Sequence, residues 1–261
     1  AAALKHVILC ERSPDQAVKT NINGVQNIIT AAILNNVEIV MFTSSDKAVN
    51  PTNVMGTTKL MGERLMTAAN SSKRKKGPIF ASTRFGNVLG SSGSVIPIFR
   101  NQISSGGPLT LTNKDMTRFV MTVEEAVKQI LNSILEARGG EVFVTKMPVM
   151  KIHDLAIAMI DELAQNKIEI KEIGSKPGEK LYEELMSDEE TRRTIELEKF
   201  FSVLPAFRGI YSDIDFSYSS VISEHTHNPY ISELQEPLTI KEIKKFLRTN
   251  DLLSGTGEIT Q

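Results

Sequence analysis

Residues 37–59, which read VEIVMFTSSDKAVNPTNVMGTTK, carry the clearest structural pattern in the chain. A short β-branched apolar run ends in small polar residues, which is typical of a buried parallel strand whose carboxyl end opens into a loop. From Pro51 to Asn70 the apolar residues Leu60, Leu65 and Met66 then recur at helical spacing. A buried strand that leads through a polar loop into a helix predicts one unit of an α/β fold.

The same alternation extends to both sides of this stretch. A helix is expected from Pro14 to Asn36 with Ser13 as its cap, and a parallel strand that ends at Phe85 should lie beside the strand end at Thr43. Further strands are predicted at 108–112, 141–145 and 168–174, and further helices at 94–104, 122–137, 151–165 and 240–248. The pattern predicts a doubly wound parallel sheet. After about Ser187 few periodic segments remain.

The composition excludes several classes of function. Lys plus Arg total 30 and Asp plus Glu total 31, so the net charge of −1 gives no general attraction to nucleic acid or to an anionic membrane. A single cysteine, Cys10, forbids an internal disulfide and indicates a reducing, cytoplasmic location. No apolar run approaches the ~20 residues that cross a bilayer, and no signal peptide is visible. The histidines lack metal-site spacing, so no metal is expected.

Three consecutive polar residues follow the predicted strand at 37–45. Ser45, Asp46 and Lys47 supply a hydroxyl, a carboxylate and an amine at the carboxyl end of a parallel strand, where open α/β sheets bind ligands. The alternative interpretation is a polar loop that only caps the next helix, because such a loop contains the same types of residue. Lys59 distinguishes the two interpretations, because it lies four residues after Met55 and therefore on the same helical face.

A tyrosine and a lysine at this spacing form the catalytic pair of short-chain dehydrogenases, and Met55 stands here in the tyrosine position. The run SSDKAVNPTNVMGTTK, Ser44 to Lys59, resembles the UDP-N-acetylglucosamine 4,6-dehydratases, which include polysaccharide biosynthesis proteins of the extended short-chain dehydrogenase/reductase superfamily. The similarity runs from residue 1 to about Met186. It implies a Rossmann-like sheet whose first strands are missing. It further implies a dinucleotide-binding remainder at 1–145, interleaved with substrate-binding segments at about 88–115, and a smaller C-terminal substrate-binding part at 146–261.

The resemblance also implies the chemistry. A tightly bound NAD or NADP would take hydride from carbon 4 of a UDP-N-acetylhexosamine, UDP-GlcNAc above all, and return it to carbon 6 after water has left. Asp46 would act as the acid and Lys47 as the base at carbon 5, which requires a lysine pKa near neutrality. Lys59 would bind the nicotinamide ribose. Met55 cannot exchange a proton, so Ser45, Asp46 or a water would deprotonate the 4-hydroxyl.

Other site residues follow from the resemblance alone. Cofactor contacts are expected at Ala2, Lys5, Asn21, Ser44, Lys59, Phe85 and Gly86. Substrate contacts are expected at Asn87, Ser94, Val95, Thr110, Arg118, Lys176 and Glu179. Arg118 would clamp the UDP diphosphate, whereas Lys176 replaces the arginine of the usual RPGEK motif and loses its planar fork. The product is expected to retain its configuration at carbon 5, and the enzyme to form a homo-oligomer.

The glycine-rich GxxGxxG loop is absent from the sequence, as is the residue that selects NAD or NADP. We therefore expect an N-terminally truncated chain. Two alternatives remain: a nucleotide-sugar epimerase or reductase of the same fold, and a catalytically silent binding subunit. The Asp46–Lys47 pair argues against the first, since a simple epimerase needs no acid and base for elimination.

Overall fold

The computed structural model describes residues 3–72, 77–91, 94–174, 178–211 and 213–254. They form two compact units, each built from separate stretches of the chain. Unit 1 comprises Ala1–Phe85, Val127–Lys146 and Glu184–Ile231. Unit 2 comprises Gly86–Ala126, Met147–Glu183 and Ser232–Gln261. How the cofactor and the substrate divide between these units stays a prediction.

A six-stranded sheet forms the centre of unit 1, in the order β1-β2-β6-β11-β10-β12. Its strands are β1 (Ile39–Ser45), β2 (Ile79–Phe85), β6 (Val142–Thr145), β11 (Phe200–Val203), β10 (Thr194–Leu197) and β12 (Val221–Ser223). β1, β2 and β6 are parallel, as predicted, and Ser45 lies opposite Phe85, so the two strand ends do meet. The three remaining strands pair antiparallel, and the weak pattern after Ser187 did not reveal them.

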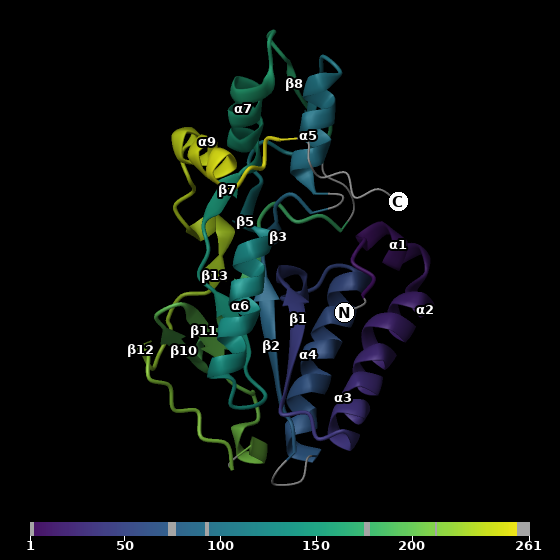
Figure 1. Ribbon diagram of the computed structural model, residues 1–261, viewed down its shortest axis with the longest axis vertical. Coiled ribbons are helices and arrows are strands. Elements are labelled where there is room, and N and C mark those ends of the chain that lie inside the picture. Colours follow the sequence, from purple (N-terminus) through teal and green to yellow (C-terminus); the bar gives the residue numbers. More distant parts are fainter. Residues whose placement is uncertain (1–2, 73–76, 92–93, 175–177, 212, 255–261) are drawn as a thin grey trace. The chain divides into compact units, whose positions relative to one another are not determined.

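Alternate residues of the parallel strands pack on opposite faces of the sheet. Val40, Phe42 and Phe80 contact α3 (Gly24–Leu34) and α4 (Val54–Ser72) through Met66 and its neighbours. Met41 and Ala81 face the other way and pack with Phe143 and Phe200. α6 (Val123–Glu136) covers that second face, where Gln129 donates to Thr83 Oγ1. The α/β class predicted from the sequence is therefore confirmed (Figure 1).

The segment predicted as one regular helix from Pro14 to Asn36 is interrupted. It consists of α2 (Pro14–Ala17), a π-helical turn η1 (Val18–Asn23) and α3, and a short helix α1 (Val7–Arg12) precedes it. Ser13 makes no side-chain capping bond, contrary to expectation. The π turn contains Asn21, whose side chain bonds to the backbone of Leu4. Such turns commonly occur at functional sites.

The described residues of unit 2 include two small sheets and three helices that share one core. The sheets are β3 (Asn87–Val88), β5 (Thr117–Met121) and β7 (Val149–Lys151), and β4 (Leu109–Leu111) with β8 (Ile170–Glu172). The helices α5 (Val95–Ser104), α7 (Ile152–Leu163) and α9 (Ile240–Thr249) enclose one apolar core. Thr239 caps α9 through a capping box with Glu242, and Thr239 is the cap that the sequence predicted.

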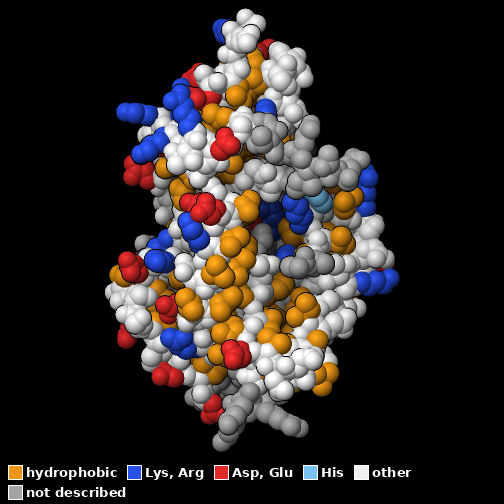
Figure 2. Space-filling model, in the orientation of Figure 1, with side chains coloured by type: hydrophobic (Ala, Val, Ile, Leu, Met, Phe, Trp, Pro, Cys, Tyr) orange, Lys and Arg blue, Asp and Glu red, His pale blue; other side chains and the backbone are white. Residues whose placement is uncertain are grey.

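The remaining elements of unit 1 are short. They are a 3-10 turn η2 (Asp46–Ala48), β9 (Glu184–Met186), α8 (Asp188–Thr191), η3 (Arg208–Tyr211) and β13 (Tyr230–Ile231), and the 3-10 turn η4 (Ser232–Leu234) belongs to unit 2. Thr122 and Glu125 form the predicted capping box of α6. Figure 2 shows apolar side chains along α6, where Val127, Leu131 and Leu135 are exposed. No helix in the described ranges is both long and apolar enough to cross a membrane.

Candidate functional site

The predicted acid and base lie in one turn at the carboxyl end of β1. Asp46 Oδ1 accepts hydrogen bonds from Ser45 Oγ at 2.6 Å, from the Lys47 backbone N–H at 2.8 Å and from Lys47 Nζ at 3.0 Å. The Asp46 side chain is 1% exposed and that of Lys47 is 28% exposed. Asp46 Oδ2 is buried with no hydrogen-bond partner among the described residues. Asp46 Oδ1 therefore holds the turn together, whereas Oδ2 takes no part in it.

A glycine of α4, Gly56, allows the helix to pack closely against this turn. A Cβ atom at Gly56 would lie 2.1 Å from the Lys47 carbonyl oxygen, so the helix approaches the turn as closely as it does only because residue 56 is glycine. Asn53 Oδ1 accepts from the Gly56 N–H and thereby caps the helix at the same point. Gly56 lies within the motif of residues 44–59, but no pattern in the sequence reveals this contact.

Lys59 points from α4 to the end of β1. Its ammonium donates to the Thr43 carbonyl at 2.9 Å and lies 5.0 Å from the centre of the Phe42 ring. The side chain is buried, and burial lowers the pKa of Lys59, although the negative charge of Glu63 opposes this shift. Met55 is also buried, and it packs with Cys10 and Ala17 as an apolar core residue.

The residues predicted on the cofactor side of unit 1 differ in their surroundings. Asn21 is buried and bonds to both backbone groups of Leu4 at 2.9 Å, so it orders the segment that contains Lys5. Lys5 itself is exposed. Ser44 Oγ is buried without a hydrogen-bond partner in the described structure, and Phe85 is half-buried at the end of β2. Ala2 lies outside the described residues.

Unit 2 holds Gly86, which was predicted to contact the cofactor, together with the predicted substrate residues Asn87 and Thr110. Gly86 fits tightly, because a Cβ atom there would lie 2.7 Å from both the Phe119 carbonyl and Met147 Sδ. Asn87 Nδ2 donates to that same Phe119 carbonyl at 3.3 Å. Thr110 is held by Gln102, which accepts from its N–H and donates to its hydroxyl. These contacts hold the predicted residues in place within their own unit.

Two predicted substrate residues stand at the start of α5. Ser94 precedes the helix in an extended conformation and makes no capping bond, and its buried hydroxyl has no hydrogen-bond partner in the described ranges. Val95 is the first helical residue and packs against the core of unit 2. A buried hydroxyl without a partner is rare in folded proteins, and the role of Ser94 as a substrate contact stays a prediction.

Arg118 is engaged inside unit 2. Its guanidinium donates to the carbonyls of Thr117, Lys180 and Leu181 at 2.8 to 3.1 Å, and its Nε lies 3.5 Å from Glu183 Oε1. Arg118 therefore holds the segment that begins at Lys180. Glu179, the residue before it, is exposed. Lys176 lies outside the described residues.

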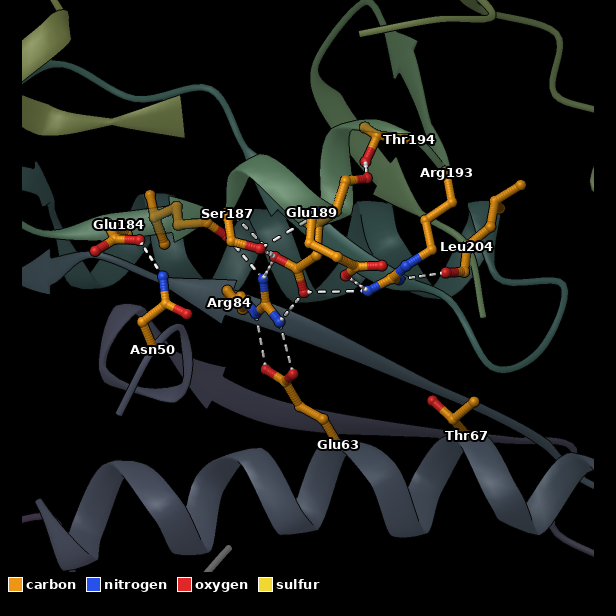
Figure 3. A network of polar contacts seen from close by, with 12 residues as sticks. Asn50, Glu63, Thr67, Arg84, Glu184, Ser187, Glu189, Arg193, Thr194 and Leu204 are labelled. Atoms are coloured by element: carbon orange, nitrogen blue, oxygen red, sulfur yellow. Dashed lines mark hydrogen bonds and ion pairs between the residues drawn. The ribbon is translucent and has the colours of Figure 1, made fainter. Parts of the chain in front are cut away.

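A buried charge network in unit 1, centred on Arg84, was not predicted from the sequence (Figure 3). Arg84 in β2 is 1% exposed and bridges Glu63 of α4 and Glu190 of α8. Burial opposes the charge of Arg84, but the two carboxylates outweigh it and raise its pKa. The available signal was an arginine inside the otherwise apolar strand IFASTRF, because such a charge needs partners.

Comparisons with known proteins agree with this fold and this motif. A family model described as polysaccharide biosynthesis protein matches residues 1–205. An uncharacterised membrane protein of Methanocaldococcus jannaschii is 53% identical over 211 residues, which are 78% of this chain and 63% of that protein. A UDP-N-acetylglucosamine 4,6-dehydratase (inverting) of Campylobacter jejuni is 41% identical over 222 residues, 85% of this chain and 65% of that enzyme. The chain thus spans less than two thirds of either relative.

A third relative, a UDP-glucose 4-epimerase of Rickettsia rickettsii, is 38% identical over 256 residues, 96% of this chain and 73% of that enzyme. Among solved structures, Pen from Bacillus thuringiensis has a TM-score of 0.87 at 42% identity and covers 97% of this chain and 74% of its own. A dTDP-glucose 4,6-dehydratase of Streptomyces venezuelae, solved with NAD and TYD bound, has a TM-score of 0.62 at 20% identity over 69% of this chain and 61% of that chain, a likeness of fold alone. With a family match across residues 1–205 and relatives of this identity, the chain belongs to the polysaccharide biosynthesis protein family, as its motif predicted.

Proposed function

We propose that this chain is the catalytic part of a nucleotide-sugar 4,6-dehydratase that converts a UDP-N-acetylhexosamine, UDP-GlcNAc first of all, to its 4-keto-6-deoxy form for glycan synthesis. The observation that carries the proposal is the Asp46–Lys47 pair, joined at 3.0 Å at the end of a parallel strand. An elimination needs both an acid for the departing hydroxyl and a base for the carbon 5 proton, whereas hydride transfer from an alcohol needs only a base for the hydroxyl proton. The Campylobacter relative supports the same reaction and substrate class.

The residues present fit a nicotinamide cofactor, NAD or NADP, which would supply hydride acceptance at carbon 4 and hydride donation at carbon 6. The Lys59 ammonium has three N–H groups, and one of them donates to the Thr43 carbonyl. Ser44 follows Thr43 in the chain, and its Oγ is buried without a hydrogen-bond partner in the described structure. These two groups would hold the ribose. A pyrophosphate loop of the GxxGxxG type is not among the 261 residues.

The hydrogen bonds of the turn suggest how protons are conserved. Ser45 Oγ donates to Asp46 Oδ1 at 2.6 Å, so the proton of the 4-hydroxyl can pass through Ser45 to Asp46. Asp46 then gives that proton to the departing 6-hydroxyl, which leaves as water, while neutral Lys47 takes the proton from carbon 5. Lys47 finally returns its proton to carbon 5. Asp46 and Lys47 end in their starting states, and Met55 is not required.

The decisive experiment replaces Lys47 by alanine in the complete protein. Loss of a general base typically costs on the order of a hundredfold to ten-thousandfold in rate, so product should fall by that factor and carbon 5 should stop exchanging with deuterated water. Cofactor binding should persist, because Lys59 carries it. Lys19→Ala is the matched control, since Lys19 is an exposed lysine of the same unit. Near-normal turnover and exchange in Lys47→Ala would remove Lys47 from the mechanism.

The Rickettsia epimerase supports a second candidate, a nucleotide-sugar 4-epimerase of the same fold. The two reactions give products that differ in composition, because a 4-epimerase keeps the 6-hydroxyl whereas a dehydratase releases it as water. Mass spectrometry of the product from UDP-GlcNAc separates them by the mass of one water molecule. Cofactor binding without any product would indicate the silent binding subunit.

A further inference from the structure

Lys59 and Glu63 form an unusual pair on α4. A lysine and a glutamate four residues apart lie on one helical face and commonly form an ion pair. Here the Lys59 ammonium donates instead to the Thr43 carbonyl at 2.9 Å. Both oxygens of Glu63 are taken by Arg84, with Nε to Oε1 at 2.9 Å and Nη2 to Oε2 at 2.8 Å. Arg84 therefore occupies the carboxylate of Glu63, and Lys59 bonds to the Thr43 carbonyl.

Arg84 is held so completely that it cannot move without losing hydrogen bonds. Its remaining donors reach the Leu185 carbonyl at 2.9 Å and both oxygens of Glu190 at 2.8 Å, so all five N–H groups of the guanidinium are used (Figure 3). The side chains of Glu63 and Arg84 are each 1% exposed. In such surroundings water cannot replace a lost partner.

The charge balance explains what Arg84 prevents. A buried carboxylate that loses its ion-pair partner is strongly destabilised, because the protein interior does not replace the hydration that the charge has lost. Without Arg84, Glu63 would have either to take up a proton or to attract the nearest cation on its own helical face, which is Lys59. The second outcome would draw the ammonium away from the end of β1.

We propose that Arg84 is a positioning residue: by occupying both oxygens of Glu63 it keeps the Lys59 ammonium on the Thr43 carbonyl, where the cofactor ribose is to bind. The role of Lys59 in this statement rests on the proposed function, but the competition between Arg84 and Lys59 for Glu63 does not. The competing interpretation is structural, with Arg84 merely joining β2 to α8 through Glu190.

The test uses the complete protein and follows Lys59 directly. NMR of isotope-labelled lysine side chains gives the pKa of Lys59, and cofactor titration and steady-state kinetics give binding and turnover. The groups around Lys59 are the charge of Glu63 on α4 and, on β1, the Thr43 carbonyl and the Phe42 ring, while the turn that contains Asp46 and Lys47 packs against α4. The variants are Arg84→Met, Arg84→Lys, Glu190→Gln and the double variant Arg84→Met with Glu63→Gln.

In Arg84→Met we expect the pKa of Lys59 to rise by about one unit or more, the size of shift that one nearby opposite charge produces. Cofactor affinity and kcat/KM should fall together, roughly tenfold or more, for the same one-unit change. The double variant should restore both, because Glu63 is then neutral. Arg84→Lys keeps the positive charge but loses the bidentate contact with Glu63, so it should show the same changes to a smaller extent. This variant also tests the proposal if Arg84→Met does not fold.

Glu190→Gln separates positioning from structure, because it weakens the link to α8 and leaves Glu63 paired. Glu190→Gln should leave the pKa of Lys59 unchanged. An unmoved Lys59 pKa in Arg84→Met and Arg84→Lys, or a double variant no better than Arg84→Met, would overturn the proposal. Lys59→Met tests the proposed function separately: normal cofactor binding there would refute the role of Lys59, whatever Arg84 does.

Discussion

The turn that carries Asp46 and Lys47 lies against a residue without a side chain. Gly56 occupies the first turn of α4, and the Lys47 carbonyl fills the space that a Cβ atom would take. An alanine in a helix usually stabilises a protein relative to glycine by about 0.5–1 kcal/mol. Here the contact reverses that sign, because the obstacle is backbone and cannot rotate away.

Gly56→Ala should therefore lower the free energy of unfolding by about 1–3 kcal/mol, the usual cost of forcing an extra methyl group into a packed site. It should also reduce turnover, because the displaced turn carries the proposed acid and base. Urea unfolding and product formation measure the two effects. Gly209→Ala is the control, since no atom lies within 4 Å of a Cβ there. Equal stability of the two variants would show that the close approach has no consequence.

At the scale of elements, Glu190 joins α8 to the strand that ends at the site. It lies in the capping box of Ser187 and also receives two bonds from Arg84. Burial alone would raise the pKa of Glu190, but the charge and hydrogen bonds of Arg84, with Ser187 and Arg193, outweigh it and lower the pKa to about 2. The bonds that hold the element together thus depend on an ionised carboxylate.

The sign of the resulting pH dependence follows directly. A carboxyl whose pKa is lower in the folded than in the unfolded protein contributes stability above its ordinary pKa of 4.5 and loses it as the pH falls toward about 2. The free energy of unfolding should therefore decline more steeply over that interval in the unmodified protein than in Glu190→Gln. Urea unfolding at a series of pH values measures the slopes. Glu236→Gln, an exposed replacement, should keep the unmodified slope, and parallel slopes in all three proteins would contradict the prediction.

At the scale of the whole molecule, the product's configuration at carbon 5 depends on which face of the sugar receives the returning proton. The family resemblance, with methionine at position 55, predicts retention, whereas the Campylobacter relative is named inverting. We keep retention as the prediction. Proton NMR of the product made by the complete enzyme measures it, and an L-arabino product would refute it. The homo-oligomer likewise stays a prediction.

The sequence alone determined the strand, the turn and the helix that bring Ser45, Asp46, Lys47 and Lys59 to one strand end. Each of these features depends on residues close together in the chain: a run of apolar residues, a cap, and a spacing of four. The same local signals placed α6 and α9 with their caps. The family resemblance extended this reading to the fold, which the family match then confirmed.

Only the tertiary structure decided the partners of that site. Glu63 and Glu190 stand 21 and 106 residues from Arg84, and no periodic pattern links positions so far apart. The strands β10, β11 and β12 are too short, at three or four residues, for their alternation to stand out, so only their pairing beside β6 identifies them. The need for glycine at position 56 likewise arises from a close approach of two backbones. Patterns in sequence report local periodicity and burial, whereas contacts between distant residues are set by packing.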